Sequence, residues 1–270
     1  MLKDITIGQY FPGHSVLHRL DPRIKMVLTI AYIVLLFLVK NSVGFLVSIV
    51  FLGACYAVAK IPVKLILRSL KPIVPILVFT GALNLLFVSG EHPIFDWGVF
   101  HLSQEGIYTA VTMAIRVLCL IAGSSLLTYT TSPIALTDAI ERLLGPLKVL
   151  HFPVHELAMM MSIALRFIPT LIEETDKIMS AQKARGADLE SGGLLQRAKA
   201  LIPILIPLFV SAFRRAEELA LAMECRCYHG GKGRTRMKQL HLTVADGAAC
   251  LVVAVVFVGV LFLNRLPIPW

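Results

Sequence analysis

The sequence carries little charge for its length. Of its 270 residues, 57% are hydrophobic and only 16% are charged. Soluble domains carry roughly 25% Asp, Glu, Lys and Arg, so this composition excludes an ordinary soluble protein and indicates one with several membrane spans. The net charge of +9 does not indicate nucleic-acid binding, because the basic residues lie in loops beside apolar runs.

Cysteine frameworks, phosphate loops and catalytic clusters are also lacking. The five cysteines are scattered, three of them within apolar runs, so no disulfide framework is indicated. The glycine-rich stretch 230–234 lacks the spacing of a phosphate loop. No cluster of nucleophile and base supports an enzyme. Two groups have metal-ligand spacing without a completing ligand: Cys225, Cys227 and His229, and His151 with His155. We expect no enzymatic activity and no cofactor or metal in this chain.

Five apolar runs are predicted to cross the membrane as helices, which makes the fold class all-α and polytopic. They cover residues 24–39, 43–59, 72–89, 107–129 and 244–264. The loop after the second run carries Lys60, Lys64, Arg68 and Lys71 and no acid, which predicts a cytoplasmic loop. Residues 90–106 contain Glu91, Asp96 and Glu105 but no Lys or Arg, as expected outside. The N-terminus is therefore expected in the cytoplasm and the C-terminus outside the cell.

The region 130–242 holds 15 of the 26 Lys and Arg residues. We predict a cytoplasmic domain here, between residues 1–129, with a lead-in and four spans, and residues 243–270, with the fifth. Ser132 and Pro133 start a short amphipathic helix that ends near Leu144. Two long amphipathic helices follow, at 154–185 and 194–227, each on the order of 50 Å in length. Within the second, residues 201–213 are too few to cross a membrane and are expected to be buried or half-inserted.

Each long helix has an apolar side with helical spacing. On the first it comprises Ile168, Leu171, Ile172, Thr175, Ile178 and Met179. On the second it comprises Phe209, Val210, Phe213, Ala216, Ala220, Met223 and Cys227. The opposite sides carry the charges, which are Glu173, Glu174, Asp176 and Lys177, and Arg214, Arg215, Glu217 and Glu218.

Both long helices end on an arginine between small residues. The two tripeptides are Ala184-Arg185-Gly186 and Cys225-Arg226-Cys227. Each arginine alone has a simple interpretation, a cation at the negative end of a helix, worth about 0.3–1 kcal/mol. The pair supports a second one, because small neighbours let a guanidinium project into a groove and bind carboxylates or carbonyls bidentately. We take these six residues as candidate docking residues for two matching grooves.

Arg116 lies near the middle of the fourth predicted span, where an unpaired charge is costly. Asp246 is the obvious acidic candidate, but it lies near the inner end of the fifth span, so direct pairing is doubtful. We expect a structural role for Arg116, bonding helix carbonyls or closing a polar contact, ahead of a substrate contact.

Several motifs together resemble the EcfT/CbiQ-like transmembrane T-component of energy-coupling factor (ECF) type ABC transporters. The first is the N-terminal run Pro12-Gly13-x-Ser15-x-Leu17-His18-Arg19-Leu20-Asp21-Pro22-Arg23-x-Lys25. Others are Thr131-Ser132-Pro133, Pro153-Val154-His155-Glu156-Leu157-Ala158 and Ala164-Leu165-Arg166-Phe167-Ile168-Pro169. Ala184-Arg185-Gly186 matches the family's first arginine motif. The second often reads Ala-Arg-Gly in the family, and this chain has Cys225-Arg226-Cys227.

The resemblance implies a bacterial cell-membrane protein that couples transport to ATP hydrolysis. Its implied partners are two ABC-type ATPase subunits, which bind ATP and Mg²⁺, and a small membrane S-component that captures a vitamin or a metal ion. The two coupling helices would cross like an X and insert their arginine ends into the ATPases. A self-sufficient secondary carrier is the alternative, but it would need inverted repeats and broken helices, and we find no repeat among the five spans.

Overall fold

The computed structural model describes residues 10–87, 93–97, 100–150, 152–187, 193–230 and 240–265. The chain divides into two compact units, one over Ile7–Ala139 with Gln239–Trp270 and one over Ile140–Lys238. Four sequence features lie outside the described residues: Ser89 at the end of the third predicted span, Glu91, His151, and the glycine-rich stretch beyond Gly230. The predicted domain boundaries at 129 and 242 stay predictions.

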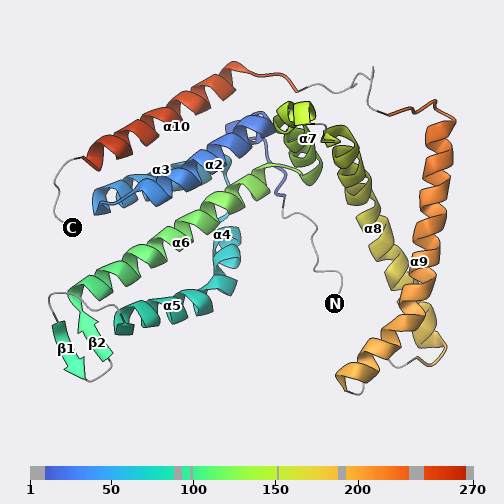
Figure 1. Ribbon diagram of the computed structural model, residues 1–270, viewed down its shortest axis with the longest axis horizontal. Helices are drawn as coiled ribbons and strands as arrows, with labels where there is room; N and C mark the ends of the chain where they lie inside the picture. The colour runs from blue at the N-terminus through green and yellow to red at the C-terminus, as the bar shows by residue number, and fades with distance from the viewer. Residues whose placement is uncertain are drawn as a thin grey trace. The chain divides into compact units, whose positions relative to one another are not determined.

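The first unit is a bundle of helices (Figure 1). Its helices are α1 (Val16–Arg19), α2 (Pro22–Leu38), α3 (Ser42–Ala59), α4 (Val63–Leu70), η2 (Lys71–Ile73), α5 (Val74–Phe87), α6 (Gln104–Thr130) and α10 (Val244–Leu263). Helix α7 (Pro133–Leu143) follows α6, and its last turn belongs to the second unit. The second unit continues with η3 (Gly145–Leu150) and the long helices α8 (Val154–Ala184) and α9 (Leu194–Glu224). The all-α prediction is confirmed, with the long helices within a few residues of their predicted bounds.

Five helices of the described residues are long and apolar enough to cross a membrane. They are α3, the run Val63–Leu85, α6, α8 and α10. The number agrees with the prediction, but the membership differs at two helices. Helix α2, the first predicted span, is not in the set because it has only 17 residues, or roughly 25 Å. It nevertheless packs inside the bundle. Helix α8 joins the set through its apolar first half, while its second half carries Glu173, Glu174, Asp176 and Lys177.

One element was not predicted. Strands β1 (Pro93–Trp97) and β2 (Phe100–Ser103) form an antiparallel hairpin between α5 and α6. The third span also differs, because its helical run begins at Val63 rather than at residue 72. The start of this helical run was not predicted because Lys64, Arg68 and Lys71 interrupt the apolar pattern of the sequence while leaving the backbone helical.

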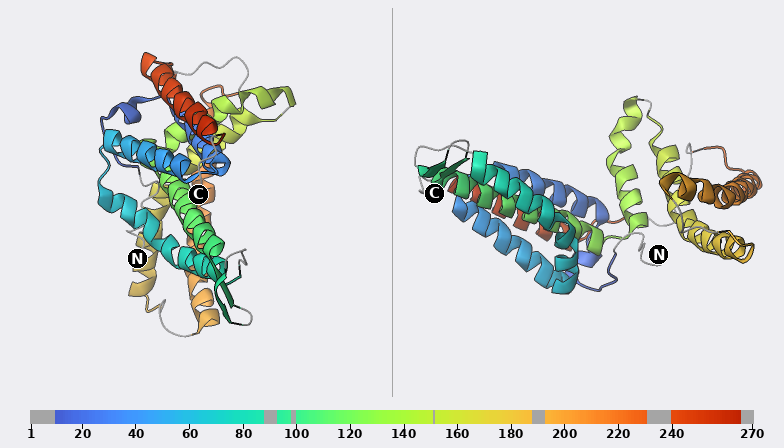
Figure 2. Two further views of the ribbon diagram at one scale, coloured as in Figure 1. Left: turned by 90° about the vertical axis from the view of Figure 1, so that its left-hand side faces the viewer. Right: turned by 90° about the horizontal axis from the view of Figure 1, so that it is seen from below.

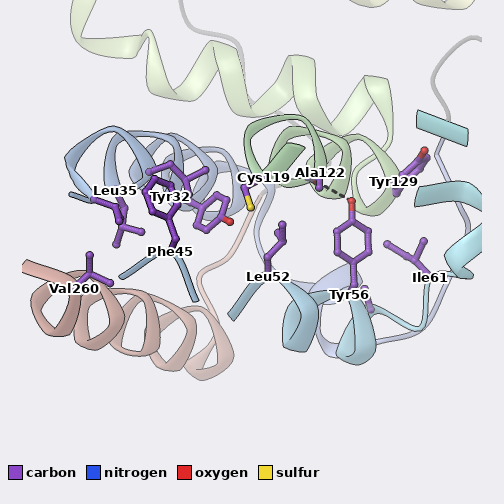
Figure 3. Close-up of a cluster of buried hydrophobic side chains, with 13 residues drawn as sticks. Tyr32, Leu35, Phe45, Leu52, Tyr56, Ile61, Cys119, Ala122, Tyr129 and Val260 are labelled. Atoms are coloured by element: carbon purple, nitrogen blue, oxygen red, sulfur yellow. Dashed lines mark hydrogen bonds between the residues drawn. The ribbon is translucent and has the colours of Figure 1, made fainter. Parts of the chain in front are cut away.

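The bundle core is closed by tyrosines whose hydroxyls bond to backbone carbonyls of other helices. In Figure 3 the Tyr56 hydroxyl points at Ala122 of α6, and its oxygen lies 2.7 Å from the carbonyl oxygen. Tyr32 donates to Ser48 at 3.3 Å, and Tyr129 donates to Leu65 at 3.1 Å. A buried hydroxyl is costly without an acceptor, so these bonds both satisfy the side chains and join α2, α3, α4 and α6.

Helix α10 is fastened to the bundle at both of its ends. At its start, the buried carboxylate of Asp246 accepts the backbone N–H of Asp21 at 2.7 Å and that of Thr243 at 2.7 Å. At its end, the Asn264 amide donates to the carbonyl of Leu38 at 2.8 Å and accepts the Lys40 N–H at 3.2 Å. The two bonds tie the last helix in the sequence to the first span, and they explain the polar residues that flank it.

The N-terminal motif folds as a compact cap on this bundle. Ser15 caps α1 and its hydroxyl lies 2.7 Å from His18 Nδ1, while His18 Nε2 lies 3.0 Å from the Phe11 carbonyl oxygen. Because the carbonyl accepts, Nε2 carries the proton and Nδ1 accepts from Ser15. Asp21 caps α2 and pairs with Arg23 at 3.0 Å. The motif is thus structural at most of its positions.

Lys25 completes this cap from inside the bundle. The residue is 7% exposed. Its Nζ donates to the carbonyls of His18 at 3.1 Å and Thr130 at 2.9 Å. A buried ammonium needs such acceptors, so Lys25 joins the N-terminal segment to the end of α6.

Candidate functional site

The first candidate docking end is the C-terminus of α8. Gly186 has a φ of +85°, a left-handed conformation that glycine adopts without steric cost. The Gly186 N–H donates to the Lys183 carbonyl and the Ala187 N–H to the Gln182 carbonyl, both at 3.0 Å. These two bonds form a Schellman motif, which satisfies carbonyls at a helix end. The motif places Arg185 at the last position before the chain reverses.

The second candidate docking end, at the C-terminus of α9, repeats this geometry. Cys227 has a φ of +53°. The Cys227 N–H donates to the Glu224 carbonyl at 2.8 Å, and the Tyr228 N–H donates to the Met223 carbonyl at 3.1 Å. Arg226 therefore occupies the position that Arg185 has in the first end. The departure from Gly to Cys leaves the backbone shape in place, at a cost of about 1–2 kcal/mol for a left-handed residue with a Cβ.

Both arginines are free to bind a partner. Arg185 and Arg226 are exposed, and neither guanidinium has a hydrogen-bond or ion-pair partner among the residues that the structure describes. Their small neighbours Ala184, Cys225 and Cys227 are exposed as well. Each helix thus ends in an accessible cation on a rigidly capped backbone, which suits insertion into a concave, electronegative site.

A polar contact holds α8 and α9 where they cross (Figure 1). Glu174 of α8 accepts a hydrogen bond from the Ser211 hydroxyl and one from Arg215 at 2.8 Å, both on α9. The Ser211 bond, with the Arg215 charge in support, lowers the pKa of the Glu174 carboxyl. The charge is therefore retained below the usual titration range of glutamate. We call these three residues the crossing cluster.

The sequence pattern does not indicate the crossing cluster. The pattern places Glu174 and Arg215 on the charged sides of the helices, and Phe209, Val210 and Phe213 on the apolar side of α9. In the structure those three are 59%, 57% and 69% exposed. The half-buried or buried side of α9 instead comprises Ile204, Leu208, Ser211, Ala212, Arg215, Leu219 and Met223. Because α9 is apolar on more than one side, its pattern cannot select the packing face, and the paired charges decide it.

The stretch 201–213 is not buried within the chain, and its half-insertion into the membrane stays a prediction. It continues α9 as helix through Pro203 and Pro207. Only Ile204 is buried, at 4% exposure, among its described residues. Leu201, Ile206 and Phe209 are 50% or more exposed. The segment is therefore an apolar helix face that this chain leaves uncovered, rather than a segment buried within the chain.

The two arginine ends are far apart on the second unit. The Gln182 amide donates to the Pro203 carbonyl at 3.2 Å, which places the end of α8 beside the first third of α9. From residue 203, α9 continues toward Arg226 over 23 residues, on the order of 35 Å at about 1.5 Å per residue. Figure 1 shows the two helices diverging above their crossing, and Figure 2 shows the pair from two further sides. One small groove therefore cannot hold both arginines.

Arg116 has the structural surroundings that the sequence suggested. Its Nη2 donates to the Val39 carbonyl at 3.2 Å, and the guanidinium carbon lies 5.3 Å from the Phe45 ring centroid. Such a cation–π contact gains strength away from water. Asp246 bonds to Asp21 and Thr243 instead. Arg116 thus closes the end of α2 against α3 and α6, and the doubt about its pairing with Asp246 was justified.

Among the described residues, no group of three or more His, Cys, Asp and Glu side chains could hold a metal ion. His155 contacts a carboxylate instead, with Nδ1 3.1 Å from Glu141. This contact joins the end of α7 to the start of α8 and was missed because the two residues are 14 positions apart.

These features define a class: a multi-pass membrane protein with a paired-helix unit that ends in two exposed arginines. Comparison with known proteins names the family. Residues 13–237 match the model of the CbiQ family, described as cobalt transport protein, and the chain belongs to this family. It is a membrane transport subunit of the T-component type.

Curated relatives match over nearly the whole chain. The energy-coupling factor transporter transmembrane protein EcfT of Ruminiclostridium cellulolyticum is 56% identical over 246 residues, covering 91% of this chain and 92% of the relative. The EcfT protein of Thermosediminibacter oceani is 54% identical, covering 96% and 97%. That of Clostridium kluyveri is 54% identical over 98% of each chain. The chain is thus similar to bacterial transporter components.

Proposed function

We propose that this chain is the non-catalytic coupling subunit of an ECF-type ABC importer in the bacterial cell membrane. In this role it transmits motion from two ATPase subunits to a membrane S-component that captures a vitamin or a metal ion. The observation that carries the proposal is the repeated helix end. Arg185 and Arg226 occupy the same place in two Schellman motifs, both exposed and without a partner among the described residues.

Each arginine end docks on one ATPase subunit. A planar guanidinium binds carboxylates or carbonyls bidentately, and the capped backbone behind it keeps the cation in a fixed place. The spacing of the ends on α8 and α9 supports two separate docking grooves. The docking residues are Ala184, Arg185 and Gly186 on one end and Cys225, Arg226 and Cys227 on the other.

ATP and Mg²⁺ bind to the ATPase subunits, and this chain carries no cofactor of its own. Closure of the ATPase pair moves the two docked ends relative to each other. The crossing cluster ties α8 to α9, so the movement reaches both helices and then the membrane bundle. Docking requires both ends on the cytoplasmic side, together with the N-terminus, and the C-terminus outside.

The experiment compares the Arg185→Ala/Arg226→Ala double variant with wild type in the complete complex reconstituted in liposomes. Substrate uptake should fall at least tenfold, and the ATPase subunits should detach or hydrolyse ATP without transport. Arg68→Ala, an exposed cation on α4, is the matched control. Wild-type uptake by the double variant contradicts the coupling role. A self-sufficient carrier is indicated instead if this chain alone transports in liposomes.

A further inference from the structure

The membrane bundle contains a cavity that the proposed coupling role does not use. Its volume is about 410 Å³, and α1, α2, α3, α6 and α10 all line it. This volume lies within the range of about 300–1,000 Å³ that is typical of small-molecule sites. The lining is almost wholly apolar; it includes Leu28, Leu52, Leu126, Ala249 and Val253. Such a cavity suits a hydrocarbon chain.

The cavity opens on the outer surface of the bundle. Val16, Val58 and Val252 belong to its lining and are 60%, 49% and 50% exposed. They come from α1, α3 and α10. Around a membrane-spanning bundle, exposed apolar side chains of this kind face lipid rather than water. The opening of the cavity is therefore surrounded by lipid, and an acyl chain can enter from the bilayer.

A free cation lies beside this mouth. Arg19 is one helical turn after Val16 on α1, is exposed, and has no side-chain partner among the residues that the structure describes. The other charges of the N-terminal cap are compensated: Arg23 pairs with Asp21, and Lys25 donates to two carbonyls beside the buried carboxylate of Asp246. Arg19 therefore supplies uncompensated positive charge on the short helix whose Val16 and Leu17 line the cavity.

We propose that this cavity is a phospholipid site, with one acyl chain inside it and the lipid phosphate bound by Arg19. The guanidinium presents several donors to phosphate oxygens. The apolar lining removes the chain from competing bilayer positions without leaving polar groups unpaired. A lipid held there joins α1 to α3 and α10, and it stabilises the cap that Lys25 and Asp246 form.

Native mass spectrometry of the detergent-purified full chain, titrated with dioleoylphosphatidylglycerol, tests this site. Wild type should bind one lipid molecule with high occupancy. Ala249→Phe fills the cavity from α10 and should reduce occupancy at least tenfold. Leu251→Phe is its control, because Leu251 is 65% exposed on α10 and does not line the cavity. Arg19→Gln should reduce occupancy several-fold, whereas Arg68→Gln, with the same change of charge, should not.

A second ligand tests the phosphate without any variant. Dioleoylglycerol lacks the phosphate, so wild type should bind it more weakly by the same factor that Arg19→Gln loses with the phospholipid. Arg19→Gln should not weaken dioleoylglycerol further. The proposal is overturned if Ala249→Phe and Leu251→Phe retain equal lipid, or if wild type binds the two ligands equally.

Discussion

At the scale of single residues, the two arginine ends differ in the residue that adopts the left-handed conformation, which is glycine in one end and cysteine in the other. Gly186 and Cys227 both adopt left-handed backbone conformations, with φ of +85° and +53°. Glycine does so freely, whereas a residue with a Cβ is strained there. The α9 end therefore holds the same shape as the α8 end at higher cost. This strain is a physical consequence of having Cys227 where the first end has Gly186.

Replacing Cys227 by glycine should relieve the strain. We expect the backbone amides at positions 227 and 228 to exchange with deuterium about fivefold more slowly than in wild type, which corresponds to about 1 kcal/mol. Hydrogen-exchange mass spectrometry of the α9 C-terminal peptide measures this. Cys225→Gly is the matched control and should accelerate exchange, because Cys225 has an ordinary helical φ of −58°. Equal effects of the two substitutions contradict the assignment of strain to Cys227.

His18 makes the N-terminal cap sensitive to acid. Burial lowers its pKa, so the folded state favours the neutral ring that accepts from Ser15 and donates to Phe11. Stability from this group is complete above the ordinary pKa of about 6.5 and is lost as the pH falls through the lowered folded value.

We expect the melting temperature of wild type to fall between pH 7 and pH 5 by a few degrees more than that of His18→Gln. Thermal unfolding in detergent across this range measures the difference. The His18 ring also packs tightly against Gly13, since a Cβ at Gly13 would lie 2.8 Å from the ring. Gly13→Ala should therefore reduce the same pH-dependent stability. Parallel pH profiles of wild type and His18→Gln exclude the role of His18.

At the scale of elements, the helices themselves followed from sequence, whereas their contacts did not. Apolar runs, Ser132 with Pro133, and the glycine after residue 185 predicted helix positions well, because these signals act within one or two turns. The hairpin of β1 and β2 pairs neighbouring segments and was missed because residues 90–106 were interpreted as an external loop. The contact between Glu141 and His155 joins residues 14 positions apart, beyond the reach of local signals. The packing face of α9 was misassigned for the same reason. Local pattern cannot show which of two apolar sides meets a neighbour.

At the same scale, the crossing cluster is a polar contact between α8 and α9. Glu174→Gln keeps the size of the side chain and removes the charge that Arg215 and Ser211 bind. Both side chains of the ion pair are partly exposed, Glu174 at 22% and Arg215 at 39%. We therefore expect the substitution to lower the free energy of unfolding by about 1 kcal/mol or less.

A spin-label distance between α8 and α9, measured by pulsed electron resonance, should broaden in Glu174→Gln and stay narrow in Glu173→Gln, the exposed neighbour. In wild type the same broadening should occur only as the pH falls below the ordinary glutamate range, because the Glu174 pKa is lowered. An unchanged distribution in Glu174→Gln removes the cluster from the account of how α8 and α9 move together.

At the scale of the whole molecule, one chain contains a membrane bundle and a paired-helix unit. The bundle is joined by tyrosine–carbonyl bonds and fastened at both ends of α10. Such bonds resist separation of the helices in lipid, where no water competes for the same groups. The second unit instead leaves apolar surface and two cations uncovered. Uncovered apolar surface and free cations of this kind are compatible with the proposed docking of partner subunits.

In the proposed function, the two arginine ends contact two ATPase subunits on one side of the membrane. Site-specific photo-crosslinking tests it directly, with the photoreactive residue at position 187 or 228, next to each arginine, in the assembled transporter. We predict that both positions crosslink to an ATPase subunit and that the same residue at position 251, facing lipid on α10, does not. Crosslinks from neither end, or labelling of the two ends from opposite sides of the membrane, would contradict the account.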